Sequence, residues 1–167
     1  MWNKIDPKTM NKNVFSMIGD QWMLITAGTV ERCNTMTASW GGMGVLWGKN
    51  VAMAFIRPQR YTFEFVEKND WFTLSFLEER YRKQLALCGA KSGRDTDKVK
   101  ECNFTVKTGE SGAPYFDEAE LVLVCRKLYW QDFDRTHFLD ASIENNYPNH
   151  DYHRMYVGEI VEALKKG

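Results

Sequence analysis

Residues 51–77 read "VAMAFIRPQRYTFEFVEKNDWFTLSFL", in which two strand-like runs flank a helical pattern. Val51 to Ile56 and Trp71 to Leu77 are short apolar runs rich in β-branched and aromatic residues, which favours buried strands. Between them, Pro58 to Asn69 gathers its apolar residues on one helical face. Proline lacks the N–H that a strand ladder needs and fits the first turn of a helix, so we expect the helix to begin at Pro58.

Outward from this stretch, the pattern predicts more strands than helices. Strands are expected at Trp22–Thr29, Ala119–Trp130 (after a shorter strand), His137–Leu139 and residues 155–164. Helices are expected at Asn11–Ile18 and at Glu78–Gly89, with Gly89 as the C-cap. The strands are not separated by regular helices, and no GxGxxG fingerprint is present, which argues against a doubly wound parallel sheet. We therefore expect a mainly β fold, a barrel or sandwich with helical additions.

The composition limits the classes of protein to consider. A length of 167 residues suits one domain spanning residues 1–167. Lys plus Arg and Asp plus Glu both number 22, and this zero net charge argues against nucleic acid as a partner. No apolar run is long enough to cross a membrane, and the N-terminus lacks the apolar core of a signal peptide. The four cysteines form no CxxC pair, so we expect a reducing, cytoplasmic location.

A polar stretch, "CNTMTASWGG" at residues 33–42, offers little to a hydrophobic core. On a strand, Thr35, Thr37 and Ser39 would share one face, and the residues between them would share the other. A face of hydroxyls is unusual in a buried strand because each hydroxyl needs a hydrogen-bond partner. The alternation alone leaves two interpretations equally open: a solvent-exposed strand edge, or a cradle for a ligand.

Arg57 and Arg60 stand three residues apart where the expected strand gives way to the helix. A helix start offers unpaired N–H groups and the positive end of the dipole, and two guanidiniums beside it suit a phosphate. An isolated RxxR pair is as often two solvated arginines on the protein surface as it is an anion site. The hydroxyl face and the arginine-flanked helix start together indicate an anion site more strongly than either does alone.

Two further segments are candidates for a ligand site. Lys91 and Ser92 could contact another part of the same ligand, although their surroundings favour a helix end followed by a mobile loop. His150 and His153 would lie near each other on a helical turn, but neither this spacing nor that of the cysteines matches a structural zinc site, so no metal is expected. His153 either caps polar groups or lines a site. No GxSxG motif supports a hydrolase.

Four segments occur in a characteristic order along the chain: "NTMTASWGGMG", "VAMAFIRPQRYTFEFVEKNDWFTLSFL", "CGAKSGRDTDK" and "HRMYVGEI". Together they resemble the flavin reductase-like, FMN-binding split-barrel family, including its flavoredoxin branch. The resemblance runs from about Phe15 to Glu162. It implies a homodimeric split β-barrel with FMN bound near the dimer interface.

The resemblance also implies a role for each motif. The segment implied to hold the flavin consists of Asn34, Thr35, Met36, Thr37, Ala38, Ser39 and Trp40. The residues implied to surround the phosphate and ribityl chain are Arg57, Arg60, Tyr61 and Thr62. Lys91 and Ser92 resemble part of a loop that closes over the cofactor, and His153 is implied to lie near the nicotinamide or the flavin edge.

The implied chemistry is hydride transfer from NAD(P)H, a transient donor, to bound FMN, followed by electron delivery to a small-molecule or protein acceptor. Backbone N–H groups along Met36 to Ser39 are expected to stabilise negative charge on the reduced ring. Two alternatives stay open: a flavoredoxin-like electron-transfer protein reduced by a protein partner, and a non-catalytic flavin- or haem-binding split barrel. The polar segment Asp140–Asp151 is longer than in short two-component flavin reductases, and we expect it to cover the mouth of the site or to reach the partner subunit.

Overall fold

A computed structural model describes all residues from Met1 to Gly167. Its main sheet runs in the order β3-β2-β6-β9-β10-β5-β4, with β1 paired to β10, and every pairing is antiparallel. The strands of this sheet are β1 (Trp2–Ile5), β2 (Met23–Gly28), β3 (Cys33–Ala38), β4 (Gly41–Leu46), β5 (Lys49–Ile56), β6 (Trp71–Leu77), β9 (Ala119–Asp132) and β10 (Arg154–Lys166). A second, two-stranded sheet contains β7 (Val106–Thr108) and β8 (Pro114–Phe116). The fold is mainly β, as the sequence predicts.

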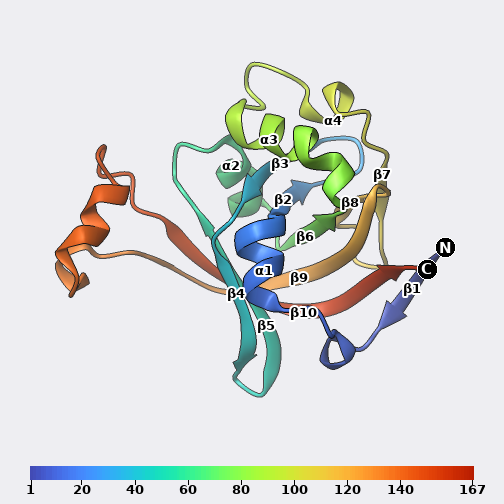
Figure 1. The fold of residues 1–167 in the computed structure, drawn as a ribbon, viewed down its shortest axis with the longest axis horizontal. Helices are drawn as coiled ribbons and strands as arrows, with labels where there is room; N and C mark the ends of the chain where they lie inside the picture. Colours follow the sequence, from blue (N-terminus) through green and yellow to red (C-terminus); the bar gives the residue numbers. More distant parts are fainter.

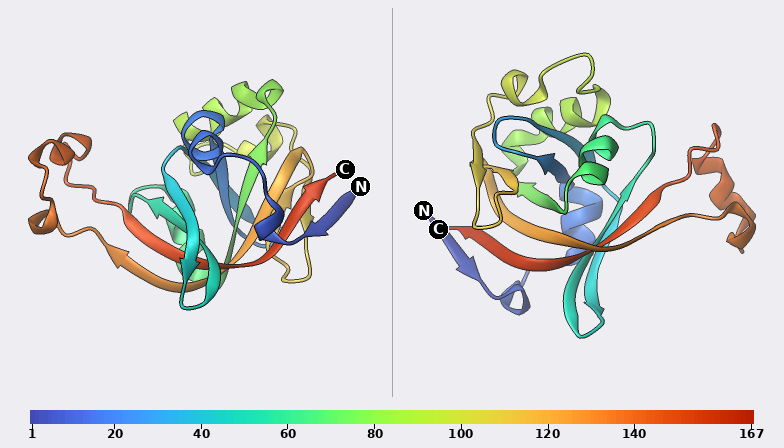
Figure 2. Two further views of the ribbon diagram at one scale, coloured as in Figure 1. Left: turned by 60° about the horizontal axis from the view of Figure 1, so that its bottom comes forward. Right: turned by 180° about the vertical axis from the view of Figure 1, so that it is seen from behind.

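Helices are short and lie outside the sheet (Figures 1 and 2). They are α1 (Val14–Ser16), which continues as a π-helical turn over Met17–Gln21, α2 (Tyr61–Lys68), α3 (Arg82–Ala90) and α4 (Lys98–Glu101). Short 3-10 turns occur at Pro7–Thr9, Glu79–Tyr81, Arg135–His137 and Ala141–Asn146. No helix of the structure has the length and apolarity that crossing a membrane requires.

Both faces of the sheet are buried, each against its own hydrophobic cluster. Leu24 and Ile25 are neighbours on β2 but belong to different clusters, because successive side chains of a strand point to opposite faces. One cluster contains Phe72 and Tyr156, and the other contains Leu85 of α3. This two-sided burial explains why β2, β6 and β9 appear in the sequence as continuous apolar runs.

The consecutive strands β3 and β4 lie at opposite ends of the sheet order. Only Ser39 and Trp40 connect them along the chain. No hydrogen-bonded ladder joins β3 to β4 or β5, so the sheet has two free ends rather than a closed circle. The candidate site described below lies where these two ends approach each other.

Three predicted helix boundaries are wrong, each for a local reason. The first helix begins at Val14 rather than Asn11, because the Asn13 side chain accepts hydrogen bonds from the Phe15 and Ser16 N–H groups. It ends at Gln21 rather than Ile18, because a π-helical turn continues it through Gly19. The second begins at Tyr61 rather than Pro58, because residues 58–60 form a turn closed by the Arg60 N–H donating to the Arg57 carbonyl.

The third boundary concerns α3. Gly89 lies inside this helix, and Lys91 is the C-cap, its N–H donating to the Leu87 carbonyl. A Cβ on Gly89 would sit 3.4 Å from the Thr37 Cβ. This glycine therefore serves the close approach of α3 to β3 instead of ending the helix.

The prediction of a strand at His137–Leu139 is also wrong. The Asp134 side chain accepts a hydrogen bond from the Thr136 N–H and starts a 3-10 turn there. Three strands were not predicted: β1, β7, and β4, whose three glycines obscure the strand pattern.

Residues 133–152, here called the arm, connect β9 to β10 and extend away from the rest of the molecule in all views (Figures 1 and 2). The polar segment Asp140–Asp151 lies within this arm. At the base of the arm, the Phe133 ring packs 5.5 Å from that of Phe55, and the Gln59 amide donates to the Asp151 carboxylate at 2.5 Å. These contacts fix the arm beside the end of β5.

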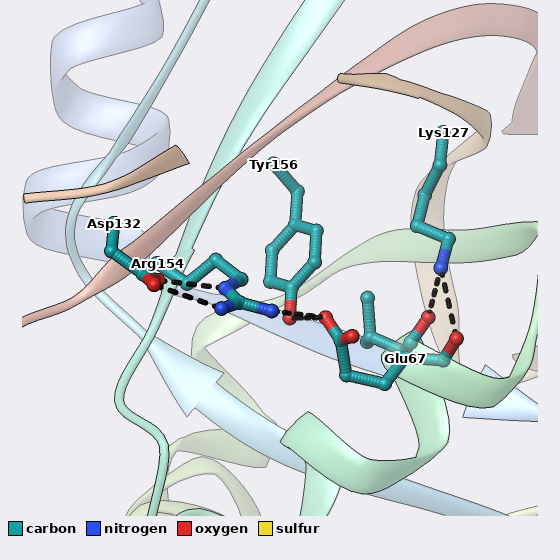
Figure 3. Close-up of polar contacts among 6 residues, drawn as sticks. Glu67, Lys127, Asp132, Arg154 and Tyr156 are labelled. Atoms are coloured by element: carbon teal, nitrogen blue, oxygen red, sulfur yellow. Dashed lines mark hydrogen bonds and ion pairs between the residues drawn. The ribbon is translucent and has the colours of Figure 1, made fainter. Parts of the chain in front are cut away.

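A polar network fastens α2 to β9 and β10 (Figure 3). The Arg154 guanidinium donates to both carboxylate oxygens of Asp132, at 2.7 and 2.8 Å, and to Glu67 at 3.1 Å. The buried Tyr156 hydroxyl donates to the same Glu67 oxygen at 2.5 Å, and Lys127 donates to the Glu67 carbonyl at 3.3 Å. Bidentate pairs of this kind fix orientation as well as distance. The C-terminal end of α2 is therefore held against the sheet, which positions Arg60 at its other end.

Candidate functional site

A cavity of about 210 Å³, here called the cradle, lies between the two free ends of the sheet. It is lined by Met36, Thr37, Ala38, Ser39, Trp40, Phe55, Arg57, Arg60 and His153. The first five come from the end of β3 and the two residues after it, and the others from the end of β5, the turn before α2 and the residue before β10. The structure thus brings together eight of the residues singled out in the sequence, from segments more than 100 positions apart.

The hydroxyl face of β3 divides into two parts. Thr35 is fully buried, and its hydroxyl lies 2.8 Å from that of Thr26 and donates to the Ile25 carbonyl at 3.2 Å. The Thr37 hydroxyl donates to the Leu85 carbonyl of α3 at 2.5 Å. The exposed-edge interpretation is therefore wrong for this strand, and both threonine hydroxyls serve packing.

Ser39 differs from these threonines. Neither its hydroxyl nor the backbone N–H of Ser39 or Trp40 hydrogen bonds to any other protein group. The turn after β3 therefore supplies donors that a ligand in the cradle can use.

Two guanidiniums occupy one side of the cradle. Arg57 pairs with Asp151 of the arm at 2.9 Å and donates to the Asn146 carbonyl at 2.9 Å. Arg60 donates to the Gly89 carbonyl at 2.9 Å, at the C-terminal end of α3, and has no carboxylate partner. Burial and the nearby Arg57 lower the pKa of Arg60. This side of the cradle therefore holds excess positive charge beside the start of α2, which suits an anionic group.

His153 closes the cradle from the β10 side. It is buried, its Nδ1 lies 2.7 Å from the Tyr147 hydroxyl, and its ring centroid is 5.3 Å from that of Trp40. Burial, with a contribution from Arg57, lowers the pKa of His153 to about 4, so the ring is neutral at pH 7. When the Tyr147 hydroxyl donates to Nδ1, the proton resides on Nε2, and His153 can donate one hydrogen bond without carrying charge.

This buried histidine predicts a pH dependence of stability. The pKa of about 4 in the folded state lies below the unfolded value of about 6.5, so the unfolded chain binds the proton more readily. The stabilisation is fully present above pH 6.5 and is lost as the pH falls towards 4. We expect the free energy of unfolding, relative to His153→Gln, to fall by about 1–2 kcal/mol over this range, allowing for solvent screening.

Urea unfolding of both proteins between pH 4 and pH 7 measures this difference. His137→Gln is the matched control, since His137 is an exposed histidine of the arm that lines neither cavity, and its replacement should change the pH profile less than that of His153. A constant difference between the wild type and His153→Gln at every pH would contradict the assignment of a neutral, buried His153.

A second cavity of about 490 Å³, here called the larger hollow, is lined in part by the loop that connects α3 to α4. Asn34, Thr35 and Tyr61 line it rather than the cradle. Thr62 is buried beneath these residues and accepts a hydrogen bond from the Asn34 amide at 2.8 Å. Of the predicted cofactor-binding residues, seven therefore line the cradle and three line the larger hollow.

Lys91 and Ser92 line neither cavity. The Lys91 ammonium pairs with Glu101 at 3.1 Å, and the Ser92 hydroxyl accepts the Arg94 N–H at 3.2 Å. The structure places both side chains in contacts within their own loop and the adjacent α4.

Phe55 and Lys98 are among the cavity-lining residues that were not singled out in the sequence. Phe55 lies two positions before Arg57 at the end of β5 and lines the cradle with it; strand alternation could have identified it. Lys98 lines the larger hollow at only 4% exposure. No local pattern distinguishes a lysine buried by distant elements from the exposed lysines around it.

The pair of histidines expected on one helical turn is not helical. His150 has a positive φ of 55°, is exposed, and contacts Tyr152, whereas His153 is buried in the cradle. No group of three or more His, Cys, Asp or Glu side chains is arranged to hold a metal ion.

Comparison with known proteins identifies the family. The model of the flavin reductase like domain matches residues 15–166. Similar structures include flavoredoxin from Methanosarcina acetivorans, with a TM-score of 0.71, 24% identity, and coverage of 97% of this chain and 76% of that one. An FMN-binding domain of a flavin reductases-like enzyme from Shewanella baltica OS155 has a TM-score of 0.71 at 14% identity, with coverage of 99% of this chain and 77% of that one.

A putative flavin reductase with a split barrel domain, from Shewanella frigidimarina, gives a TM-score of 0.67 at 16% identity, covering 95% of this chain and 74% of that one. No curated protein matches the sequence. At these identities the structures show the fold, a split barrel, and the free ends of the sheet are the split. The chain belongs to the flavin reductase-like domain family.

Proposed function

We propose that this protein binds FMN in the cradle and catalyses hydride transfer from NAD(P)H to the bound flavin. The observation that carries the proposal is the convergence of the β3 end, Arg57, Arg60 and His153 on one cavity. The family match and the FMN-binding protein among the similar structures support it.

The groups around the cradle fit the chemistry of FMN. An isoalloxazine needs flat apolar walls and N–H donors for its carbonyl and ring acceptors, and its phosphate needs cations. Trp40, Phe55 and His153 supply rings. Ser39 and Trp40 supply N–H donors without protein partners, and Arg57 and Arg60 supply positive charge.

Bound FMN would supply the capacity to accept a hydride and pass electrons on. The chain's own groups bind and orient the reactants. The N–H groups after β3 and the Arg60 guanidinium would stabilise negative charge placed in the cradle. Neutral His153 would orient a polar group through Nε2. The Trp40 ring, 47% exposed, borders the solvent side from which a transient donor can enter.

A flavoredoxin-like electron carrier is the second candidate. The arm favours it, because an extended segment joined to the cradle through Arg57 and Asp151 offers a docking element for a protein that donates electrons. In that case the flavin would be reduced by a protein partner and not by a pyridine nucleotide.

We further propose a homodimer and a cytoplasmic location. The turn between β4 and β5 exposes Trp47, whose ring lies 6.2 Å from that of exposed Tyr129, and Val45 and Trp130 are exposed as well. A second copy covering such residues would remove this exposed apolar surface from water. Sedimentation velocity measures the mass in solution. The four cysteines are free thiols, which suits a reducing compartment.

Anaerobic absorbance spectroscopy tests the proposed function. The purified protein is loaded with FMN and mixed separately with NADH, with NADPH and with a reduced protein donor such as a ferredoxin. Bleaching of the flavin by a pyridine nucleotide supports the reductase. Bleaching by the protein donor alone supports the carrier. Failure to take up FMN would contradict both.

The role of His153 is tested in the same assay. His153→Gln is expected to bind FMN but to reduce it about fivefold more slowly, because one orienting hydrogen bond is worth about 1 kcal/mol. Stopped-flow bleaching at saturating donor separates this rate from donor binding. Equal rates for the two proteins would leave His153 with a packing role only.

A further inference from the structure

Tyr147 is the one buried residue of the arm. Its exposed fraction is 3%, while every other residue of 133–152 is half-buried or exposed. Tyr147 lines neither the cradle nor the larger hollow. A single buried side chain in an otherwise exposed segment is held by contacts outside that segment. Two of these contacts are with residues that line the cradle, namely Arg57 and His153.

The ring of Tyr147 is held from several sides. The rings of Phe138 and Tyr152, also in the arm, have their centroids 6.0 and 5.0 Å from that of Tyr147, and Phe138 is stacked at an interplanar angle of 11°. The guanidinium carbon of Arg57 lies 4.9 Å from the ring centroid, which is a cation–π distance. Because this ring is packed between neighbours, its hydroxyl occupies a defined place beside His153.

The Tyr147 hydroxyl has one partner in the protein. It lies 2.7 Å from Nδ1 of His153 and makes no other hydrogen bond. A buried O–H group needs an acceptor. If Nδ1 carried the imidazole proton, it would donate to the tyrosine oxygen, and the phenolic proton would have no acceptor. The hydroxyl therefore donates to Nδ1, and the neutral imidazole carries its proton on Nε2.

Nε2 of His153 is the ring nitrogen that remains for a ligand. It makes no hydrogen bond to any protein group, and His153 lines the cradle. Without the bond to Tyr147, the imidazole would be free to take the other tautomer or to turn over about its Cβ–Cγ bond. Either change would put an acceptor or a carbon where the Nε2–H donor stands. The bond to Tyr147 excludes both.

The charged residues near His153 do not decide its tautomer. Arg57 at the end of β5 and Asp151 of the arm both influence the ring electrostatically, and they pair with each other at 2.9 Å. Arg60, the other cation of the cradle, donates to the end of α3. None of the three hydrogen bonds to His153, so Tyr147 alone determines which nitrogen is protonated.

We propose that Tyr147 is a positioning residue for the reaction in the cradle: its hydroxyl holds His153 as the Nε2–H tautomer, in the orientation that lets Nε2 donate to a bound ligand. The inference rests on the proposed function for the reaction that His153 serves. Because Tyr147 lines neither cavity, it acts only through His153. The arm thus contributes to the site through a side chain that no ligand in the cradle touches.

NMR of the imidazole nitrogens tests the tautomer in the protein before any FMN is added. The chain has only 3 histidines, and the His153 signals are those that His153→Gln lacks. At pH 7 we expect wild-type His153 to carry its proton on Nε2. In Tyr147→Phe, which keeps the ring and loses the hydroxyl, the Nδ1–H tautomer should appear as well. Protonation of Nδ1 in the wild type, or unchanged His153 signals in the variant, would overturn the proposal.

Stopped-flow reduction of the FMN-loaded protein tests whether this arrangement matters for the reaction. At saturating donor, Tyr147→Phe is expected to bleach the flavin about two- to fivefold more slowly, since only part of the population keeps the competent arrangement. The KM for the donor should not change. Added to His153→Gln, Tyr147→Phe should cause no further loss, because a residue that acts through His153 has no effect in its absence. Additive losses, or the full rate in Tyr147→Phe, would contradict the positioning role.

Tyr152→Phe is the matched control for loss of a phenolic hydroxyl from the arm. Tyr152 packs on Tyr147, but its own hydroxyl donates to Glu144, and it lines neither cavity. Both the His153 signals and the rate of bleaching should match the wild type. A change in the His153 tautomer as large as that in Tyr147→Phe would assign the effect to packing of the arm and overturn the proposal.

The positioning role and the proposed function can fail separately, because the NMR measurement needs no flavin. A protein that takes up no FMN but shows the expected tautomers loses the flavin function and keeps the assignment of Tyr147 to His153. A protein that reduces FMN with Nδ1 of His153 protonated keeps the function and loses the positioning role.

Discussion

Replacing Arg57 and Arg60 together by alanine is expected to weaken FMN binding at least about a hundredfold. Each charge-assisted contact to a phosphate contributes on the order of 1.5–3 kcal/mol, and both guanidiniums line the cradle. The loss should be smaller for Arg57 alone, because its charge is already shared with Asp151. Quenching of flavin fluorescence on titration with the apoprotein measures the dissociation constant.

Arg80→Ala is the control for loss of a guanidinium as such. Arg80 is exposed, pairs with Glu78 and lines neither cavity, so FMN affinity should be unchanged. Because Arg60 also binds carbonyls at the end of α3, thermal melting must show that the double variant remains folded. A folded double variant with wild-type affinity would rule out the proposed anion contacts.

Gly28→Ala is expected to cost at least about 3 kcal/mol of folding free energy. Gly28 has a φ of 121°, and a Cβ there would lie 2.3 Å from the Arg32 carbonyl oxygen and 2.8 Å from the Cys33 Cα. Both are backbone atoms, so the clash cannot be relieved by a side-chain rotation. The turn from β2 into β3 must move instead. Urea unfolding followed by circular dichroism measures the loss.

Two other glycines separate the causes of this loss. Gly48 has a φ of 68°, and no atom lies within 4 Å of the position that a Cβ would occupy, so Gly48→Ala should cost only the backbone strain, about 1 kcal/mol. Gly44 has open space and no positive φ, and Gly44→Ala should be nearly neutral. If Gly28→Ala were no more costly than Gly48→Ala, the clash with the Arg32 carbonyl would not be the cause.

Strands buried on both faces were the most predictable part of the fold. β2, β6 and β9 appear as apolar runs because two clusters cover the sheet. β4 was missed because Gly41, Gly42 and Gly44 carry no side-chain signal. Its turn could have been detected: Trp47 and Gly48 form a two-residue connection with φ positive at both, which a tight hairpin requires.

The candidate site was predictable as a set of segments but not as a set of contacts. The motifs containing Thr37, Arg60 and His153 do meet in one cavity. Which groups are free for a ligand depends on partners far along the chain, such as the Leu85 carbonyl that accepts from Thr37. The same holds for Lys98, whose burial is imposed by β3 and α3. Local sequence contains no information on such partners.

The free ends of the sheet have a consequence for folding. A molecule in the cradle touches the end of β3 and the end of β5 at once, although no ladder joins these strands. Such a molecule therefore links the two ends of the sheet and stabilises the folded state. The added free energy of unfolding is about 2.7 kcal/mol when the concentration of free ligand exceeds its dissociation constant a hundredfold. The protection falls mainly on the terminal strands, which have the fewest neighbours, and least on β6 and β9 at the centre. Cofactor supply in the cell would then set how long each copy survives, as well as whether it is active.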